Sequence, residues 1–137
     1  SRKSLMSARA KARKAAVDLL FAADLRGKEP SLEDLDLLGR ENREYTKSLI
    51  DGVKEHRDRI DSLIHTYAQD WDKDRLPAVD RNILRVAIYE LLWGSLDHSV
   101  AISEAVSLAE LLSTEKSAKF INGLLARISG LAATLPR

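Results

Sequence analysis

Apolar residues recur at helical spacing along nearly the whole of this 137-residue chain, and this periodicity restricts the fold more than any other feature. In the first segment the i, i+4, i+7, i+8, i+11 order of one helix face is followed by Ala12, Ala16, Leu19, Leu20 and Ala23. No segment shows a convincing alternation of apolar and polar residues, which a half-buried strand would need. The sequence therefore predicts an all-α protein of six or seven helices.

Glycine and proline residues mark the expected ends of these helices. Gly27 is placed to end the first helix in a left-handed conformation, and a short helix is expected between Ser31 and Gly39. Pro77 suits a first helical turn, where no N–H has to be donated. The other helices are expected over residues 42–68, 78–93, 100–112 and 114–133.

The polar segment 69–77 separates two helical groups within what we expect to be one domain, residues 1–137. This division gives two packed three-helix-type halves, at roughly 8–70 and 76–135. Asn122-Gly123 would ordinarily indicate a hairpin turn. Both flanks keep the helical period, however, so we interpret Gly123 as a close-packing point inside the last helix, at a cost of about 1 kcal/mol.

Positive charge is concentrated in residues 1–14, which we call the basic arm. Six of the 22 Lys and Arg residues lie there with no acid, so the remaining 123 residues carry 16 bases against 21 acids. Arg9 and Arg13 share one face of the expected helix, as do Lys11 and Lys14. The helix dipole disfavours cations at this end unless phosphates neutralise them. The arm therefore favours a nucleic-acid partner; the alternative is a solvated, frayed end.

Residues that could support catalysis or metal binding do not converge in the sequence. The chain has no cysteine, and it lacks the HExxH, Walker and GxGxxG motifs. His56 and His65 are nine residues apart and project from opposite helix faces. Asp70, Asp72 and Asp74 alternate as calcium ligands do, but without the required Gly and Glu partners. We therefore expect no enzyme, no metal and no cofactor, and no apolar run is long enough for a membrane span.

A second candidate binding element is the segment "SAKFING", residues 117–123. Lys119, Phe120 and Asn122 place a cation, an aromatic surface and an amide within one helical turn. Readers of single-stranded RNA use this combination for phosphate, base face and base edge. The alternative is that Phe120 belongs to the core, as most aromatic residues at helical spacing do.

Three segments taken together resemble the NusB family of bacterial transcription antitermination factors, in an actinobacterial form. They are "KARKAAVDLLFAADL" (11–25), "LPAVDRNILRVAIYELL" (76–92) and "VAISEAVSLAELLSTEKSAKFINGLLARI" (100–128). The resemblance implies binding to boxA RNA of ribosomal RNA leader transcripts, with ribosomal protein NusE and RNA polymerase as partners, in the cytoplasm.

The resemblance also implies site residues. The RNA-binding positions would be Arg9, Lys11, Arg13, Lys14, Lys119, Phe120 and Asn122. Positions near the RNA or NusE surfaces would be Phe21, Asp80, Arg81 and Arg85. Phe21 stands where tyrosine is common in the family, which removes a hydroxyl group.

Three other readings of the chain remain open. It could be a NusB-like domain cut from a ribosomal RNA cytosine methyltransferase, although no glycine-rich cofactor domain follows before Arg137. It could be a helical adaptor that binds protein only. It could also form a condition-dependent homodimer, because Val17, Phe21 and Leu25 lie off the main apolar stripe of the first helix and need cover.

Overall fold

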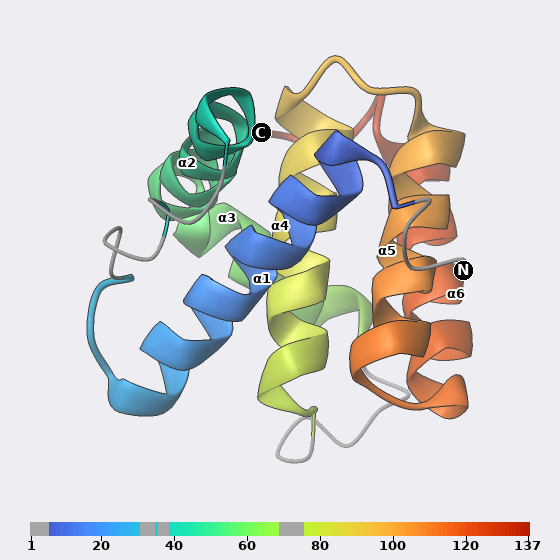
Figure 1. Ribbon diagram of the computed structural model, residues 1–137. Helices are drawn as coiled ribbons and strands as arrows, with labels where there is room; N and C mark the ends of the chain where they lie inside the picture. The colour runs from blue at the N-terminus through green and yellow to red at the C-terminus, as the bar shows by residue number, and fades with distance from the viewer. Residues whose placement is uncertain (1–5, 31–34, 36–38, 69–75) are drawn as a thin grey trace.

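The computed structural model describes residues 6–30, 35, 39–68 and 76–137, and this part of the chain is helical without any strand. The all-α prediction is confirmed. Six helices follow one another in the described part of the chain (Figure 1): α1 (Ala8–Arg26), α2 (Arg40–Glu55), α3 (Arg57–Tyr67), α4 (Ala78–Trp93), α5 (His98–Leu112) and α6 (Glu115–Leu131).

Helix α4 lies at the centre of the molecule and contacts each of the other five helices. Its apolar residues are buried on all sides, as is typical of a helix enclosed by protein; they include Ile83, Leu84, Val86, Ala87 and Ile88. One hydrophobic cluster extends from Ala16 on α1 to Ile128 on α6. The six helices therefore share one core, with α4 in contact with all the others.

The ends of α1 and α6 follow from local sequence. Ser7 caps α1 by accepting a hydrogen bond from the amide of Ala10, and Thr114 caps α6 in the same way from Ser117. Gly27 ends α1 with φ of 62°, as predicted, and the amide of Lys28 donates back to the Ala23 carbonyl at 3.1 Å. This arrangement is a Schellman motif, which strongly favours glycine at the left-handed position because glycine has no β-carbon.

The prediction of one long helix over residues 42–68 is wrong, because the chain bends at His56 (φ −106°, ψ 19°) and forms α2 and α3. Aromatic side chains of α4 lie against the bend. The His56 ring stacks on Trp93, with centroids 3.9 Å apart, and the Tyr89 ring packs over Gly52. The apolar period continues through the bend, so it gave no sign of the break.

Gly123 lies inside α6 as predicted, but its interpretation as a close-packing point is wrong. A β-carbon there would meet nothing within 4 Å, whereas one at Gly52 would collide with the Tyr89 ring. The short helix expected between Ser31 and Gly39 lies almost entirely outside the described residues, as does most of the predicted junction at 69–77. The exact division into halves stays a prediction.

Candidate nucleic-acid interface

The first turns of α1 carry the described part of the basic arm, and no acid lies among them. Arg9 and Lys11 are exposed. The Arg9 guanidinium lies 3.9 Å from the centroid of the Tyr45 ring on α2. Lys14 is partly exposed, and its Nζ is 2.8 Å from Asp18 Oδ2. Arg9 and Lys11 therefore present positive charge to the solvent, while Lys14 has an acid beside it.

Arg13 is placed differently from its neighbours, because its side chain turns inward and is only 4% exposed. Its Nε donates to Glu90 Oε1 at 2.8 Å and its Nη2 donates to Oε2 at 3.1 Å. Burial alone would lower the pKa of Arg13, but the hydrogen bond and charge of Glu90 outweigh it and raise the pKa. The expected stripe of Arg9 and Arg13 is therefore not formed, and the burial of Arg13 argues against its expected phosphate contact.

Tyr45 completes this buried contact. Its hydroxyl donates to Glu90 Oε2 at 2.5 Å and accepts from Arg13 Nη2 at 3.2 Å. Burial raises the pKa of Tyr45 to about 12, and the hydrogen bond to Glu90 and the negative charge of Glu90 act in the same direction. The hydroxyl therefore stays protonated, and the ring is held at a fixed place beside the arm. Sequence reasoning missed both Tyr45 and Glu90.

On α6 the three candidate residues do not share one face. Lys119 and Asn122 are exposed, while Phe120 is half-buried and packs against the core. Phe120 and Asn122 are two positions apart, which is about 200° around a helix, so they lie on opposite flanks. An RNA strand touching both would have to pass over the outer face of α6, where Lys119 lies.

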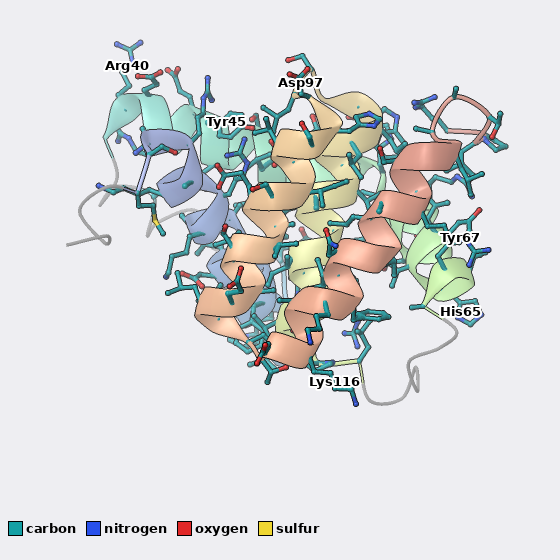
Figure 2. The ribbon with its side chains drawn as sticks, turned by 90° about the vertical axis from the view of Figure 1, so that its right-hand side faces the viewer. Arg40, Tyr45, His65, Tyr67, Asp97 and Lys116 are labelled. Carbon is teal, nitrogen blue, oxygen red and sulfur yellow. The ribbon has the colours of Figure 1, made fainter. Side chains whose placement is uncertain are left out.

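The structure does not bring the arm and the α6 residues together. In Figure 2, α5 lies between α1 and α6. Tyr45, which Arg9 covers, is at the upper end of this view, and Lys116, one turn before Phe120, is at the lower end. A ligand that contacted both elements would have to cross the surface of α5.

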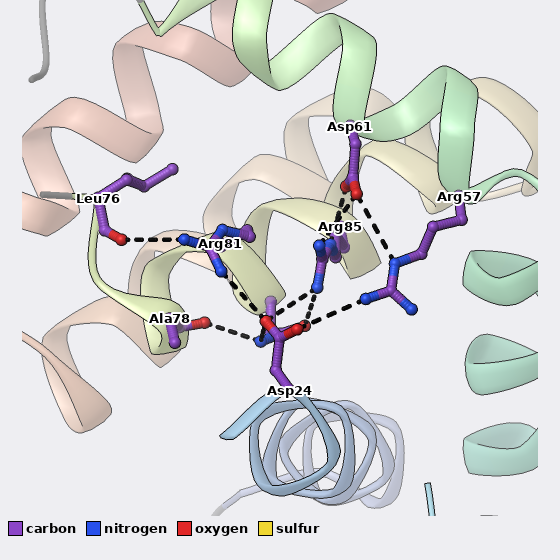
Figure 3. A network of polar contacts seen from close by, with 8 residues as sticks. Asp24, Arg57, Asp61, Leu76, Ala78, Arg81 and Arg85 are labelled. Carbon is purple, nitrogen blue, oxygen red and sulfur yellow. Dashed lines mark hydrogen bonds and ion pairs between the residues drawn. The ribbon is translucent and has the colours of Figure 1, made fainter. Parts of the chain in front are cut away.

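A second polar cluster lies at the other end of α1 and surrounds Asp24 (Figure 3). Asp24 Oδ2 is 3.1 Å from Arg85 Nη1 and 3.3 Å from Arg81 Nη1, and Asp24 Oδ1 is 3.5 Å from Arg57 Nη2. Asp61 on α3 holds the rest of the Arg85 guanidinium, with Nε 2.8 Å from Oδ1. Burial would raise the pKa of Asp24, but these arginines, Arg85 first, lower it below its usual range.

This cluster changes how the predicted partner-facing residues are interpreted. Arg85 is 5% exposed and joins α1, α3 and α4, so its direct role is structural. Arg81 is about one-third exposed and can also face a partner. The sequence analysis missed Asp24 and Asp61. A buried arginine requires an acid beside it, but the burial of Arg85 is seen only in the structure.

The remaining candidates differ in exposure. Asp80 is fully buried, and neither of its carboxylate oxygens has a hydrogen-bond partner among the described residues. It therefore offers no surface to a partner here. Phe21 is half-buried, and Leu25 is 66% exposed. Val17 is fully buried, so its cover comes from its own chain, and only Phe21 and Leu25 remain for a second copy to cover.

Within the described ranges no helix is long and apolar enough to cross a membrane, and no group of three or more acidic, His or Cys residues is placed to hold a metal ion.

Comparisons with known proteins agree with this fold. A family model described as the NusB family matches residues 10–130. The transcription antitermination protein NusB of Salinispora arenicola is 48% identical over 134 residues, which cover 93% of this chain and 98% of that protein. The structure of T. maritima NusB has a TM-score of 0.79 at 36% identity, covering 89% of this chain and 90% of that one.

A crystal structure of antitermination factors NusB and NusE in complex with dsRNA also matches. Its TM-score is 0.79 at 32% identity, and the match covers 90% of this chain and 96% of that chain. The resemblance seen in the sequence is confirmed.

Proposed function

This chain belongs to the NusB family, and we propose that it acts as an RNA-binding transcription antitermination factor. In this proposal it binds boxA-type RNA of ribosomal RNA leader transcripts together with ribosomal protein NusE. The complex then promotes antitermination by RNA polymerase in the cytoplasm. The proposal is supported by the similarity to a NusB protein solved with NusE and RNA.

The observation that carries the proposal is the placement of Arg9 and Lys11. Both are exposed at the start of α1, where the helix dipole disfavours cations and no acid of the first turn compensates them. Phosphate groups remove this penalty, and electrostatic contacts of this kind supply most of the sequence-independent affinity for nucleic acid. Lys14 would add a weaker contact, because it must exchange Asp18 for phosphate.

We assign the second RNA contact to α6. Lys119 would meet phosphate, the accessible part of the Phe120 ring would stack on a base, and Asn122 would read a base edge. Phe21 and Arg81 are the partly exposed candidates for the NusE surface. Arg85 would support that surface from inside by positioning Asp24 and Asp61.

The test is a filter-binding measurement with boxA RNA and a scrambled RNA of the same composition, each with and without NusE. We expect boxA to bind more tightly than the scrambled RNA, and NusE to increase the difference. Equal binding of both RNAs with NusE present would contradict boxA recognition. Binding of NusE without any binding of RNA would favour the alternative of an adaptor that acts through protein contacts alone.

The proposal includes a condition-dependent homodimer. Leu25 is 66% exposed and Phe21 is half-buried on α1, so a second copy could cover both in a twofold contact. Sedimentation at micromolar concentration tests this. We expect a dimer that dissociates on Phe21→Asp or on addition of RNA; a monomer under all three conditions would contradict it.

We expect no catalytic activity from the chain.

A further inference from the structure

A cavity of about 250 Å³ lies directly beside the arm, between α1, α2 and the C-terminal end of α4. Tyr45 and Tyr89 form part of its wall, and Arg9, which also lines it, lies over the Tyr45 ring. Ser48 and Ser95 line it and are exposed; the Ser48 hydroxyl donates to the Tyr45 carbonyl at 2.6 Å, so its oxygen stays available as an acceptor. The cavity therefore combines aromatic surface, polar edge groups and an adjacent exposed cation, Arg9, which is stacked on Tyr45.

The inner wall of this cavity is electrically balanced and fixed in place. The charge of Arg13 is matched by Glu90, which it contacts at 2.8 Å. The same two residues hold the Tyr45 hydroxyl at 3.2 Å and 2.5 Å. A ligand entering here gains little from negative charge, because the inner cation is already paired. It gains most from flat aromatic surface, because the Tyr45 ring is already ordered before the ligand arrives.

Arg9 covers the surface that such a ligand would use. Its guanidinium is 3.9 Å from the Tyr45 ring centroid, which is stacking distance. A cation–π contact at an exposed site is weak, so a phosphate group can draw the Arg9 side chain away. Arg9 and a flat ligand would therefore compete for one face of Tyr45, and phosphate binding by Arg9 would uncover that face.

We propose that this cavity receives one unstacked base of the bound RNA, with the base against Tyr45 and the flanking phosphate on Arg9. The inference rests on the proposed RNA-binding function and adds to it a specific base site. Aromatic walls suit any base face, while the Ser48 oxygen can accept a hydrogen bond from a base edge and the Ser95 hydroxyl can bond one. Because the base and the phosphate belong to one nucleotide, binding of the phosphate opens the site that its own base fills.

The test uses a set of boxA RNAs, each carrying one abasic site at a different position. Binding is measured for the full chain, for Ser48→Trp, which fills the cavity from α2, and for Ser62→Trp as a control. Ser48 takes no part in the Arg13–Glu90 contact, and Ser62 is exposed on α3 and does not line the cavity. Thermal melting of each variant confirms that it is folded.

We expect two abasic positions to weaken binding by the unsubstituted chain and by Ser62→Trp about tenfold each, one for the base proposed to stack on Phe120 and one for the base in the cavity. Ser48→Trp should bind intact RNA about tenfold less tightly, with an unchanged salt dependence. It should keep the loss at the Phe120 position and lose no further affinity at the cavity position. Ser95→Trp, which fills the cavity from the connection after α4, should repeat this result if Ser48→Trp does not fold.

Two outcomes overturn the base site while leaving the RNA-binding proposal intact. One is an abasic profile that is the same in Ser48→Trp and in the unsubstituted chain. The other is tight RNA binding in which no abasic position matters. If the unsubstituted chain binds no RNA at all, the proposed function itself fails, and that result is distinguishable from both.

Discussion

Arg13 and Glu90 lie 77 positions apart in the chain and meet in a two-point ion pair, with Nε 2.8 Å from Oε1 and Nη2 3.1 Å from Oε2. The pair joins the first turns of α1 to the central helix α4. It therefore fixes the direction in which the basic arm leaves the core. Two arginines one helical turn apart, Arg9 and Arg13, thus have different tasks: one faces solvent and the other holds the helix.

Arg13→Ala should destabilise the protein by about 3–5 kcal/mol, because it leaves the Glu90 carboxylate buried without its cation. Urea denaturation measures the loss. Arg9→Ala, at an exposed position, should leave the unfolding midpoint nearly unchanged. If Arg13→Ala instead leaves stability unchanged and abolishes RNA binding, Arg13 contacts the RNA and does not stabilise the fold through Glu90.

Arg9→Ala and Lys11→Ala should each make the salt dependence of RNA binding shallower by about 0.7 in log Kd against log salt. Each removes one exposed cation from the phosphate path. Lys54→Ala is the matched control, because Lys54 pairs with Glu29 at the far end of α2 and should not change the slope. Equal slopes for all four proteins would place the phosphate contacts elsewhere.

Phe120→Ala should have two effects, because the ring is half-buried. Loss of stacking on one base should weaken RNA binding about tenfold. Loss of packing should cost about 1–2 kcal/mol, less than the 3–5 kcal/mol typical of a fully buried phenylalanine. Asn122→Ala, at an exposed position, should weaken RNA binding without changing the melting temperature. A Phe120→Ala protein with full RNA affinity would remove this residue from the interface.

Raising the pH should reveal the contact between Tyr45 and Glu90. The pKa of Tyr45 is raised from 10.0 to about 12, so the folded state favours the protonated hydroxyl. Its contribution to stability is complete below about pH 10 and is lost between about pH 10 and 12. The difference in unfolding free energy between the unsubstituted chain and Tyr45→Phe should therefore shrink over this range. If the difference in unfolding free energy stays constant over this range, the Tyr45 hydroxyl and the Glu90 carboxylate do not interact as described.

Two glycines inside helices should respond to alanine in opposite directions. Gly123→Ala should stabilise the protein by up to about 1 kcal/mol, because the new methyl group meets open space and alanine favours helix. Gly52→Ala should destabilise it, because its β-carbon would collide with the Tyr89 ring. Thermal melting of both variants checks this pair, and a destabilised Gly123→Ala would show that the outer face of α6 is packed against something.

Much of the fold could be predicted because its cause is local. Apolar spacing gave the helices, and Gly27 marked the end of α1 through its backbone freedom. The bend at His56 could not be predicted, since it depends on aromatic rings of α4 that lie more than thirty residues further along the chain. The interpretation of Gly123 failed for a related reason, because spacing alone does not tell which face of a helix another helix covers.

The candidate site was predictable only in its exposed part. Charge density identified the arm, and Arg9 and Lys11 lie on the surface as expected. The same density included Arg13, whose environment is set by Glu90 on another helix. Asp24 and Asp61 were missed because an acid in a helical sequence is normally interpreted as solvent-exposed. Only the structure shows that Arg85, from another helix, lies beside both of them.

The central position of α4 has a consequence for cooperativity. Each of the other helices contacts it, so no group of helices within the described chain can open without exposing part of its buried surface. The chain should consequently unfold in one step, with circular dichroism and tryptophan fluorescence following the same curve. The slowest amide hydrogen exchange should occur in α4, and amides at the start of α1 should exchange first. The first turn of α1, before Arg13, would thus be able to adapt to a ligand while α4 stays folded.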